Sequence, residues 1–358
     1  MKNKLKIAVG LVLGVFLLWL LFRDTNWPAV WQAVKQMDPF WLLISQVVIF
    51  ISFFTRVHRW KYIVRTAKDV PYSKLFSATQ IGFLGNFVLP GRAGELIRAL
   101  VLSRLAALPI TRCIAFVTLD RVTDLVGLLA VMLVAALTYH PERATVLPEG
   151  YSLPSWAEPL LQPNAIQFFA ASMAGVLVAL IACLVLLYIN QRLAFWLNDR
   201  IVGLLSKKLA EKTHGMLEQF AKGLHILRSA RDMAKAIVFS LMTWSMFIAF
   251  YYVLMQAFHI PETPIYAPFV VVTMISIAIS LPGAPGFIGQ FHVAITVGML
   301  LTMEDFDLDV AKAMALVGHI LNVIPIALTG GYCLYAEKMG LFELRRESER
   351  TEAELENA

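Results

Sequence analysis

The sequence predicts an all-α integral membrane protein that crosses a bilayer several times. Of the 358 residues, 58% are hydrophobic and only 16% are charged, whereas an ordinary soluble domain is about 25% charged. A soluble chain of this length could not bury so much apolar surface in one core. We expect one membrane domain over residues 1–336 and a charged cytoplasmic tail over residues 337–358, typical of a solvated helix.

Six apolar segments approach the roughly 20 residues that a spanning helix needs. The first follows Lys2, Lys4 and Lys6. Because no small-residue cleavage pattern comes after it, we expect an uncleaved span rather than a signal peptide. The predicted spans cover residues 5–22, 40–55, 113–139, 168–189, 236–258 and 313–335.

The distribution of Lys and Arg between the loops predicts the orientation. Residues 56–74 carry six Lys/Arg and one acid, and residues 190–233 carry eight and four. We expect both in the cytoplasm, together with both termini, and the loops at 140–165 and 302–310 outside. The net charge of +6 suggests contact with anionic lipid headgroups rather than nucleic acid. Leu193 to Leu205 has helical apolar spacing that suits the inner membrane surface.

Two apolar segments, residues 75–112 and 265–302, are broken by Pro and Gly. Leu89-Pro90-Gly91-x-x-Gly94 matches Leu281-Pro282-Gly283-x-x-Gly286 at a displacement of 192 residues. The flanking spans match at nearly the same displacement, and the loop charges place the halves in opposite orientations. Such inverted repeats with broken helices point to a transport site. The breaks are either re-entrant hairpins or pairs of full crossings.

The sequence therefore divides into inverted halves at residues 40–139 and 236–335. A span at 166–189 and a basic cytoplasmic loop at 190–235 join them.

Charged residues cluster after the first break and in the next span. Glu95 is three residues from both Arg92 and Arg98, and Asp120, Arg121 and Asp124 follow. Charges at such depth normally face a cavity or one another. They either neutralise each other or form a polar site in which Arg92 and Arg98 bind a phosphate. The candidate substrate-binding residues are Asn86, Pro90, Arg92, Glu95, Arg98, Asp120, Arg121, Asp124, Pro282, Gly283, Gly286, Gln290, His292, His319 and Asn322.

Recognisable catalytic motifs are absent from the sequence. It has no phosphate-binding GxxxxGK[ST] loop, no G-x-S-x-G elbow and no H-E-x-x-H helix. Asp120 and Asp124, at i and i+4, could hold Mg²⁺, although two carboxylates beside an arginine make a poor metal site. We therefore expect no enzyme activity, no cofactor and no bound metal.

Three stretches resemble the lysylphosphatidylglycerol synthase transmembrane-domain family, also described as flippase-like. They are NFVLPGRAGELIRALVLSR, DRVTD and LPGAPGFIG, and the resemblance covers most of the chain. Its most specific part is Pro90, Arg92, Gly94, Glu95 and Arg98 with Arg121 and Asp124. Family members typically have Glu-Arg where this chain has Asp120-Arg121. Many carry a glutamate where it has Gln290 and His292, which implies a different headgroup.

The resemblance implies a protein of the bacterial inner membrane that moves or shields a lipid headgroup. In the synthases a soluble aminoacyl-transfer domain follows, whereas this sequence ends about 20 residues after the last span, so we do not expect synthase activity. The leading hypothesis is translocation of an anionic or polyprenyl-phosphate-linked lipid. The alternatives are a non-catalytic partner of a lipid or glycan synthesis enzyme and a membrane-embedded lipid-phosphate transferase.

Overall fold

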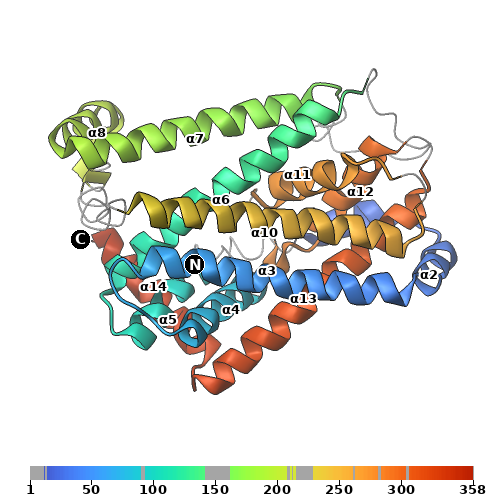
Figure 1. The fold of residues 1–358 in the computed structure, drawn as a ribbon, viewed down its shortest axis with the longest axis horizontal. Helices are drawn as coiled ribbons and strands as arrows, with labels where there is room; N and C mark the ends of the chain where they lie inside the picture. Colours follow the sequence, from blue (N-terminus) through green and yellow to red (C-terminus); the bar gives the residue numbers. More distant parts are fainter. Residues whose placement is uncertain are drawn as a thin grey trace.

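The described part of the molecule is helical. The computed structural model describes residues 12, 14–89, 93–141, 162–207, 210–211, 213–214, 229–260, 263–280, 284–303 and 306–357. All regular structure in these ranges is α- or 3₁₀-helix (Figure 1), which confirms the predicted fold class. Pro90, Arg92, Pro282, Gly283 and residues 142–161 lie outside the described residues.

Five described helices are long and apolar enough to cross a membrane. Four are regular and match predicted spans: α3 (Pro39–Val64), α6 (Ile110–Thr138), α10 (Ala230–Ala257) and α13 (Leu308–Ala336). The fifth, Pro285–Thr302, is not one continuous helix. A short 3₁₀ helix, η4 (Pro285–Phe287), precedes α12 (Gln290–Thr302). Gly286 within η4 and Gly289 just before α12 have positive φ angles.

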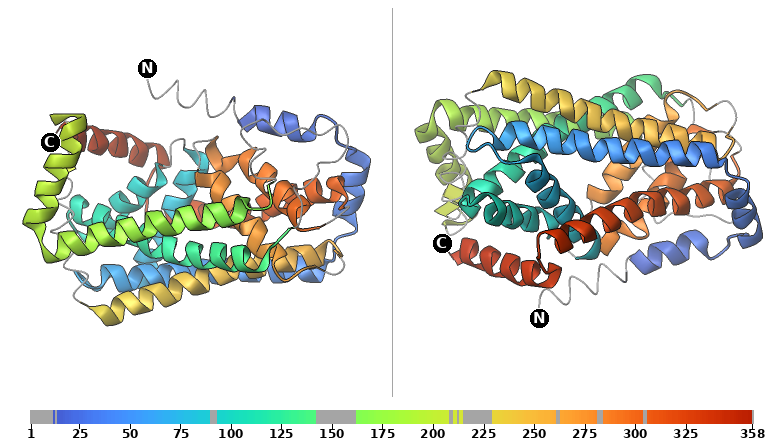
Figure 2. Two further views of the ribbon diagram at one scale, coloured as in Figure 1. Left: turned by 90° about the horizontal axis from the view of Figure 1, so that it is seen from above. Right: turned by 60° about the horizontal axis from the view of Figure 1, so that its bottom comes forward.

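The remaining helices complete the bundle. α7 (Ala165–Ile189) coincides with the predicted span at 168–189. Of the first predicted span, residues 14–22 are described and helical. They lead to α2 (Trp27–Lys35) at one end of the molecule (Figure 2).

Helix α3 is longer than predicted. Its N-cap Asp38 accepts a hydrogen bond from the backbone nitrogen of Phe40 at 2.8 Å, and Pro39 occupies the first turn. It then continues to Val64 through residues that we predicted as cytoplasmic loop. The extra turns contain Arg56 and Arg59, and the helix can bury Arg59 because carboxylates on another helix balance its charge.

Helices α3 and α10 lie side by side and run in opposite directions (Figure 1). The backbone nitrogen of Asp38, before α3, donates to the carbonyl of Ala257, at the end of α10, at 2.9 Å. At the other end Arg65 pairs with Asp232. These two helices occupy the first position in the two predicted halves, so the corresponding elements run in opposite directions.

Two broken hairpins pack inside this frame. The first is α4 (Tyr72–Val88) with α5 (Gly94–Ala106), and the second is α11 (Ala267–Ser280) with η4 and α12. They lie toward opposite ends of the bundle (Figure 1). Their tips meet, since the rings of Phe87 and Phe287 are edge-on with centroids 6.0 Å apart.

Each hairpin is tied to the end of a long helix. Near the start of α4, Lys74 Nζ and Ser77 Oγ donate to Glu337, just after α13, at 2.6 and 2.8 Å. Burial by itself would raise the pKa of Glu337, but these bonds outweigh it, so the pKa lies below its ordinary value. In the second half the Tyr139 hydroxyl, after α6, donates to the Leu301 carbonyl of α12 at 2.7 Å.

The two halves pack by the same scheme. α4 lies against α13 and α11 against α6, while α5 contacts α6 and α12 contacts α13. This correspondence agrees with two inverted halves, although the predicted domain boundaries stay a prediction.

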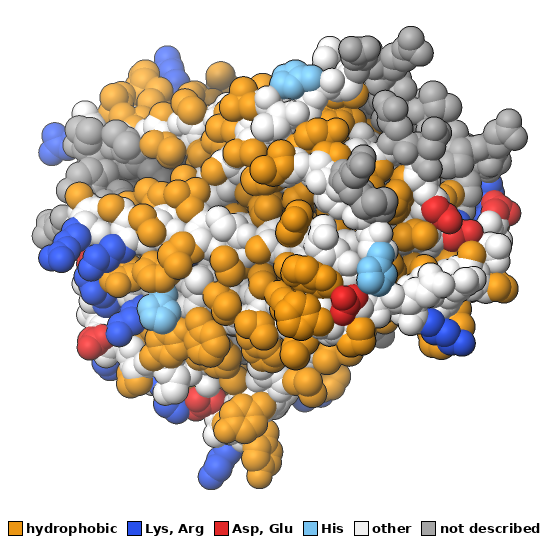
Figure 3. Space-filling view, turned by 45° about the vertical axis from the view of Figure 1, so that its right-hand side comes forward, with side chains coloured by type: hydrophobic (Ala, Val, Ile, Leu, Met, Phe, Trp, Pro, Cys, Tyr) orange, Lys and Arg blue, Asp and Glu red, His pale blue; other side chains and the backbone are white. Residues whose placement is uncertain are grey.

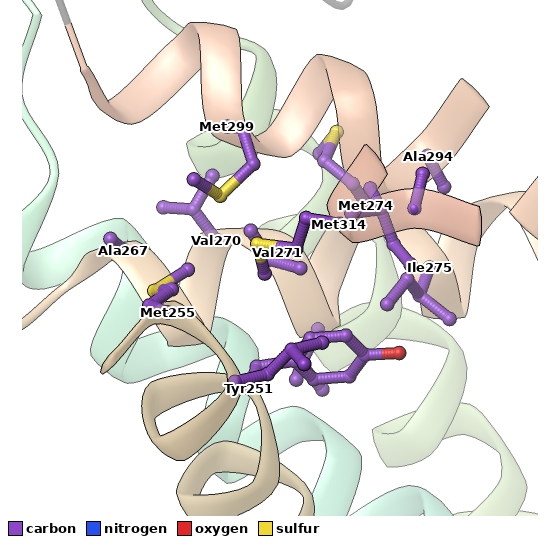
Figure 4. Packing of buried hydrophobic residues seen from close by; sticks show 14 of the residues in the cluster. Tyr251, Met255, Ala267, Val270, Val271, Met274, Ile275, Ala294, Met299 and Met314 are labelled. Atoms are coloured by element: carbon purple, nitrogen blue, oxygen red, sulfur yellow. The ribbon is translucent and has the colours of Figure 1, made fainter. Parts of the chain in front are cut away.

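An apolar core joins the elements of the second half. Figure 4 shows Tyr251 and Met255 of α10 facing Val271 and Met274 of α11, with Met299 and Met314 beside them. Outside, apolar side chains cover much of the visible face, and charged ones gather toward its margins (Figure 3), as expected for a surface in contact with lipid.

Two amphipathic helices lie at the end of the bundle where α5 ends: α8 (Gln191–Leu205) and α14 (Leu341–Asn357). The tail predicted as a solvated helix is helical, but it docks on the bundle. Arg104 of α5 pairs with Glu343 and Glu347, and Leu344 is fully buried.

Candidate functional site: a charge network among the long helices

A buried carboxylate shared by two arginines forms the centre of the candidate site. Asp120 of α6 is fully buried. Its Oδ1 accepts from Arg59 Nε of α3 at 2.8 Å, and its Oδ2 accepts from Arg98 Nη1 of α5 at 2.6 Å. A buried charge is costly unless it is paired and hydrogen-bonded. Asp120 meets this condition, so it joins three helices that are distant in sequence.

Arg98 is enclosed on a second side by an aromatic ring. Its guanidinium carbon lies 3.7 Å from the ring centroid of Trp60 on α3. Trp60 is itself fully buried and Arg98 is 2% exposed. Stacking on an aromatic face and pairing with Asp120 fix Arg98 in the interior.

Asp124 extends the network toward α10. Its carboxylate accepts from Arg59 Nη1 at 2.5 Å, from Arg121 Nη1 at 3.2 Å and from Trp244 Nε1 at 3.2 Å. The hydroxyl of Ser240, also on α10, accepts from Arg59 at 3.3 Å and donates to the Thr123 carbonyl at 2.7 Å. Arg59 thereby contacts both carboxylates and α10.

Glu95 and Arg121 form the outer part of the network. Arg121 pairs with Glu95 at 3.4 Å, and its side chain is 37% exposed. Arg121 Nε and Nη2 and Glu95 Oε2 are inaccessible atoms for which the described residues supply no hydrogen-bond partner. Arg121 is thus held by its ion pairs with Glu95 and Asp124, while part of its side chain stays exposed.

Arg56 is the fourth arginine of the region. It precedes Arg59 by one helical turn and is partly exposed. It lies over the rings of Phe83 on α4 and Phe247 on α10, at 4.9 and 4.8 Å. Asp120 and Asp124 are close enough to act on its charge, but no described carboxylate lies within ion-pair distance of it.

The described charges in this region do not cancel. Arg56, Arg59, Arg98 and Arg121 supply four positive charges, whereas Glu95, Asp120 and Asp124 supply three negative ones. The described residues of the network therefore carry one excess positive charge.

Close helix packing holds the first hairpin over this network. A Cβ at Gly94 would overlap the Gly82 carbonyl oxygen and would lie 2.6 Å from the Asn86 backbone nitrogen. Only glycine permits this approach of α5 to α4. The Oδ1 atom of Asn86 lies at the same contact and has no hydrogen-bond partner among the described residues.

The second hairpin is held by a pair of histidines. His319 Nε2 lies 2.9 Å from the Gly286 carbonyl, and its Nδ1 lies 3.4 Å from His292 Nε2. The Gly289 nitrogen donates to His292 Nδ1 at 3.4 Å. One set of neutral tautomers satisfies the whole chain, with His292 donating to His319 and His319 donating to Gly286.

The other second-half candidates lie apart from this pair. Gln290 Nε2 donates to the Ala278 carbonyl at 3.2 Å, within its own hairpin. Asn322 Nδ2 donates to the Gly318 carbonyl at 2.8 Å, along α13.

The structure thus brings most of the described candidates together in two places. Glu95, Arg98, Asp120, Arg121 and Asp124 form one network, and Gly286, His292 and His319 form another. Arg56 and Arg59 were not among the predicted site residues, because the charge rule assigned both of them to a loop. Their spacing of three residues on a segment that continues an apolar helix, followed by Trp60, is the signal that could have identified them.

Comparisons with known proteins agree with this fold. The family described as "Lysylphosphatidylglycerol synthase TM region" matches residues 7–330. A "UPF0104 membrane protein" of Methanothermobacter thermautotrophicus is 24% identical over 305 residues, which is 79% of this chain and 82% of that protein. "Glycosyltransferase AglD" of Haloferax volcanii is 27% identical over 311 residues, 83% of this chain, and the match spans about half of that protein, 49%. Because the family matches nearly the whole chain, the protein belongs to the lysylphosphatidylglycerol synthase TM region family.

Proposed function

We propose that this protein moves a phosphate-bearing lipid between the two leaflets of the bacterial inner membrane, with both of its termini in the cytoplasm. The observation that carries the proposal is the arginine-rich network of α3, α5, α6 and α10, with its excess positive charge. A net charge among apolar spanning helices is expensive, and such residues mark substrate paths in membrane proteins. An anionic lipid headgroup would neutralise it.

The hairpin geometry supports a route across the bilayer. α4 has 17 residues and α12 has 13, so they are about 25 and 20 Å long, shorter than the roughly 30 Å hydrocarbon core. Their tips meet at Phe87 and Phe287. We infer that both hairpins are re-entrant and that they enter from opposite sides. A headgroup would pass between them while its acyl chains stay in lipid.

The network residues divide this work between them. Arg59, Arg98 and Asp120 are buried and paired, so they hold α3, α5 and α6 together. Arg121 is the most exposed of the three paired arginines, so it would contact the headgroup. Rocking of the inverted halves would open the site to each side in turn.

A metal-dependent transferase has less support. Both oxygens of Asp120 already accept from arginines, and Asp124 contacts Arg59 and Arg121. Within the described residues, no group of three or more His, Cys, Asp or Glu is placed to hold a metal ion.

Leaflet exchange in vesicles tests the proposal. In vesicles containing the purified protein, a fluorescent phosphatidylglycerol should become accessible to an external quencher much faster than in protein-free vesicles. Arg121→Gln should slow this exchange by at least about tenfold, since it removes a charged donor worth roughly 1.5–3 kcal/mol. Arg112→Gln, at an exposed position on the same helix, is the matched control and should exchange like the wild type.

Two results would count against this account. Wild-type exchange no faster than in empty vesicles would refute translocation of this lipid. Equal exchange in Arg121→Gln and Arg112→Gln would refute the proposed role of Arg121.

A second candidate function rests on the Haloferax volcanii relative. It is named a glycosyltransferase, and the match spans about half of its length. The chain could thus serve as a membrane module that supplies lipid to a glycan-transferring enzyme. A stoichiometric glycosyltransferase that co-purifies with the protein, together with no exchange by the isolated protein, would favour this function.

A further inference from the structure

We propose that Arg56 binds the phosphate group of a lipid through its guanidinium, which lies beside the rings of Phe83 and Phe247. This site deepens the proposed translocation function and rests on it for its role in the cell. It differs from the paired network that the family motifs identify. Arg56 belongs to none of the three stretches that carry the family resemblance.

Charge balance is the first reason. Arg59, Arg98 and Arg121 each have a described carboxylate within 4.0 Å. Arg56 has no such partner, although it lies within the same helix, eight residues before the end of α3 at Val64. That places it about 12 Å from the helix end. An unpaired guanidinium at this depth is costly unless an anion joins it.

The surroundings of the guanidinium are the second reason. Phe83 comes from α4 and Phe247 from α10, and α3 packs against both helices. Both ring centroids lie within 4.9 Å of the guanidinium carbon, and the guanidinium carries five N–H donors in one plane. No described residue accepts a hydrogen bond from them. A fork with free donors matches two oxygens of one phosphate.

The position of Arg56 favours a ligand that reaches it from within the bundle. Phe54, two residues earlier, is 48% exposed on the outer surface. Two residues correspond to about 200° of helical rotation, so Arg56 lies on nearly the opposite side of α3. Phe83 is five residues before the end of α4 at Val88, where the first break follows. A phosphate on Arg56 would therefore lie beside the broken hairpin.

Aromatic walls favour a lipid over a free anion. Arg56 is flanked by two apolar rings, which can pack against the glycerol and first methylenes of a lipid but offer nothing to hydrated inorganic phosphate. The excess charge of the network further favours a headgroup with net negative charge.

Lipid binding in detergent tests the site without requiring transport. Titration of the full-length protein with dioctanoyl phosphatidylglycerol should show saturable binding, while dioctanoylglycerol, which lacks the phosphate, should bind far more weakly. Arg56→Gln should weaken phosphatidylglycerol binding by at least about tenfold, consistent with the loss of a bidentate charged contact. Arg56→Lys should give an intermediate affinity, since it keeps the charge and loses the fork.

Arg65→Gln is the matched control. Arg65 follows the end of the same helix and lies over the Tyr62 ring at 4.6 Å, but it pairs with Asp232. Its substitution should leave phosphatidylglycerol affinity within about twofold, because a paired arginine has no free fork for phosphate. The lipid-free unfolding midpoint of Arg56→Gln should not fall below that of the wild type, since no ion pair is lost.

The outcomes separate the two proposals. Wild-type affinity in Arg56→Gln overturns the Arg56 site, even if the wild type moves lipid between leaflets. Loss of binding in Arg56→Gln supports the site, even if the wild type moves no lipid and the proposed function fails. Displacement of the lipid by an equal concentration of inorganic phosphate would identify a free anion as the ligand and would overturn the lipid assignment.

Discussion

At the scale of single residues, Arg56 and Arg59 differ sharply although one helical turn separates them. Arg59 is 1% exposed and contacts Asp120, Asp124 and Ser240. Arg56 touches two aromatic rings and no described acid. A paired, buried arginine stabilises the fold, whereas an unpaired and accessible one remains available for a ligand. The same residue type on the same helix thus serves two purposes.

Substitution of Arg59 should destabilise the protein strongly. Arg59→Gln leaves the buried Asp120 with fewer donors, and breaking a buried ion pair costs about 3–5 kcal/mol. We expect a clearly lower unfolding midpoint in detergent, followed by tryptophan fluorescence. Adding Asp120→Asn to Arg59→Gln should not recover the loss, because it leaves the buried Arg98 without its carboxylate. An unchanged midpoint in Arg59→Gln would show that the network does not stabilise the bundle.

At the scale of elements, the first hairpin depends on glycine at the contact between α4 and α5. A methyl group at Gly94 would overlap the Gly82 carbonyl, so Gly94→Ala should push α5 away from α4. Overpacking of this kind typically costs about 1–3 kcal/mol. Gly175 of α7 is the matched control, because a Cβ there meets nothing within 4 Å.

The two glycine variants should therefore differ in their effect on the stability of the protein. Gly175→Ala should be neutral or stabilising by up to about 1 kcal/mol through helix propensity, while Gly94→Ala should lower the unfolding midpoint and reduce lipid exchange. Equal midpoints for the two variants would contradict the close approach of α5 to α4.

The sequence predicted the elements better than the contacts between them. Apolar length located α6, α10 and α13, and the Pro/Gly breaks located both hairpins. Asp120 and Asp124 were recognised as buried charges, but Arg59, their partner, precedes them by 61 and 65 residues. No local pattern reports such a distance, and the charge rule assigned Arg59 to a loop. His292 and His319 were chosen separately, and only the packing of α12 on α13 joins them.

At the scale of the whole molecule, the two hairpins approach from opposite ends and meet near Phe87 and Phe287. This arrangement predicts a cross-link between the halves. With Cys113, Cys183 and Cys333 replaced by alanine, Phe87→Cys and Phe287→Cys together should react with a short thiol cross-linker. Phe76→Cys with Phe287→Cys is the control, because Phe76 is eleven residues earlier on α4, about 16 Å along the helix. Equal cross-linking of the two pairs would contradict the meeting of the tips.

Translocation as proposed requires a lipid phosphate to enter the arginine-rich region between the long helices. The most direct measurement is a cryo-EM map of the protein in nanodiscs that contain phosphatidylglycerol. We expect headgroup density beside Arg56, between Phe83 and Phe247 and within reach of Arg121, and its loss in Arg56→Gln. Headgroup density confined to the two membrane surfaces, with none beside Arg56 in the wild type, would contradict it.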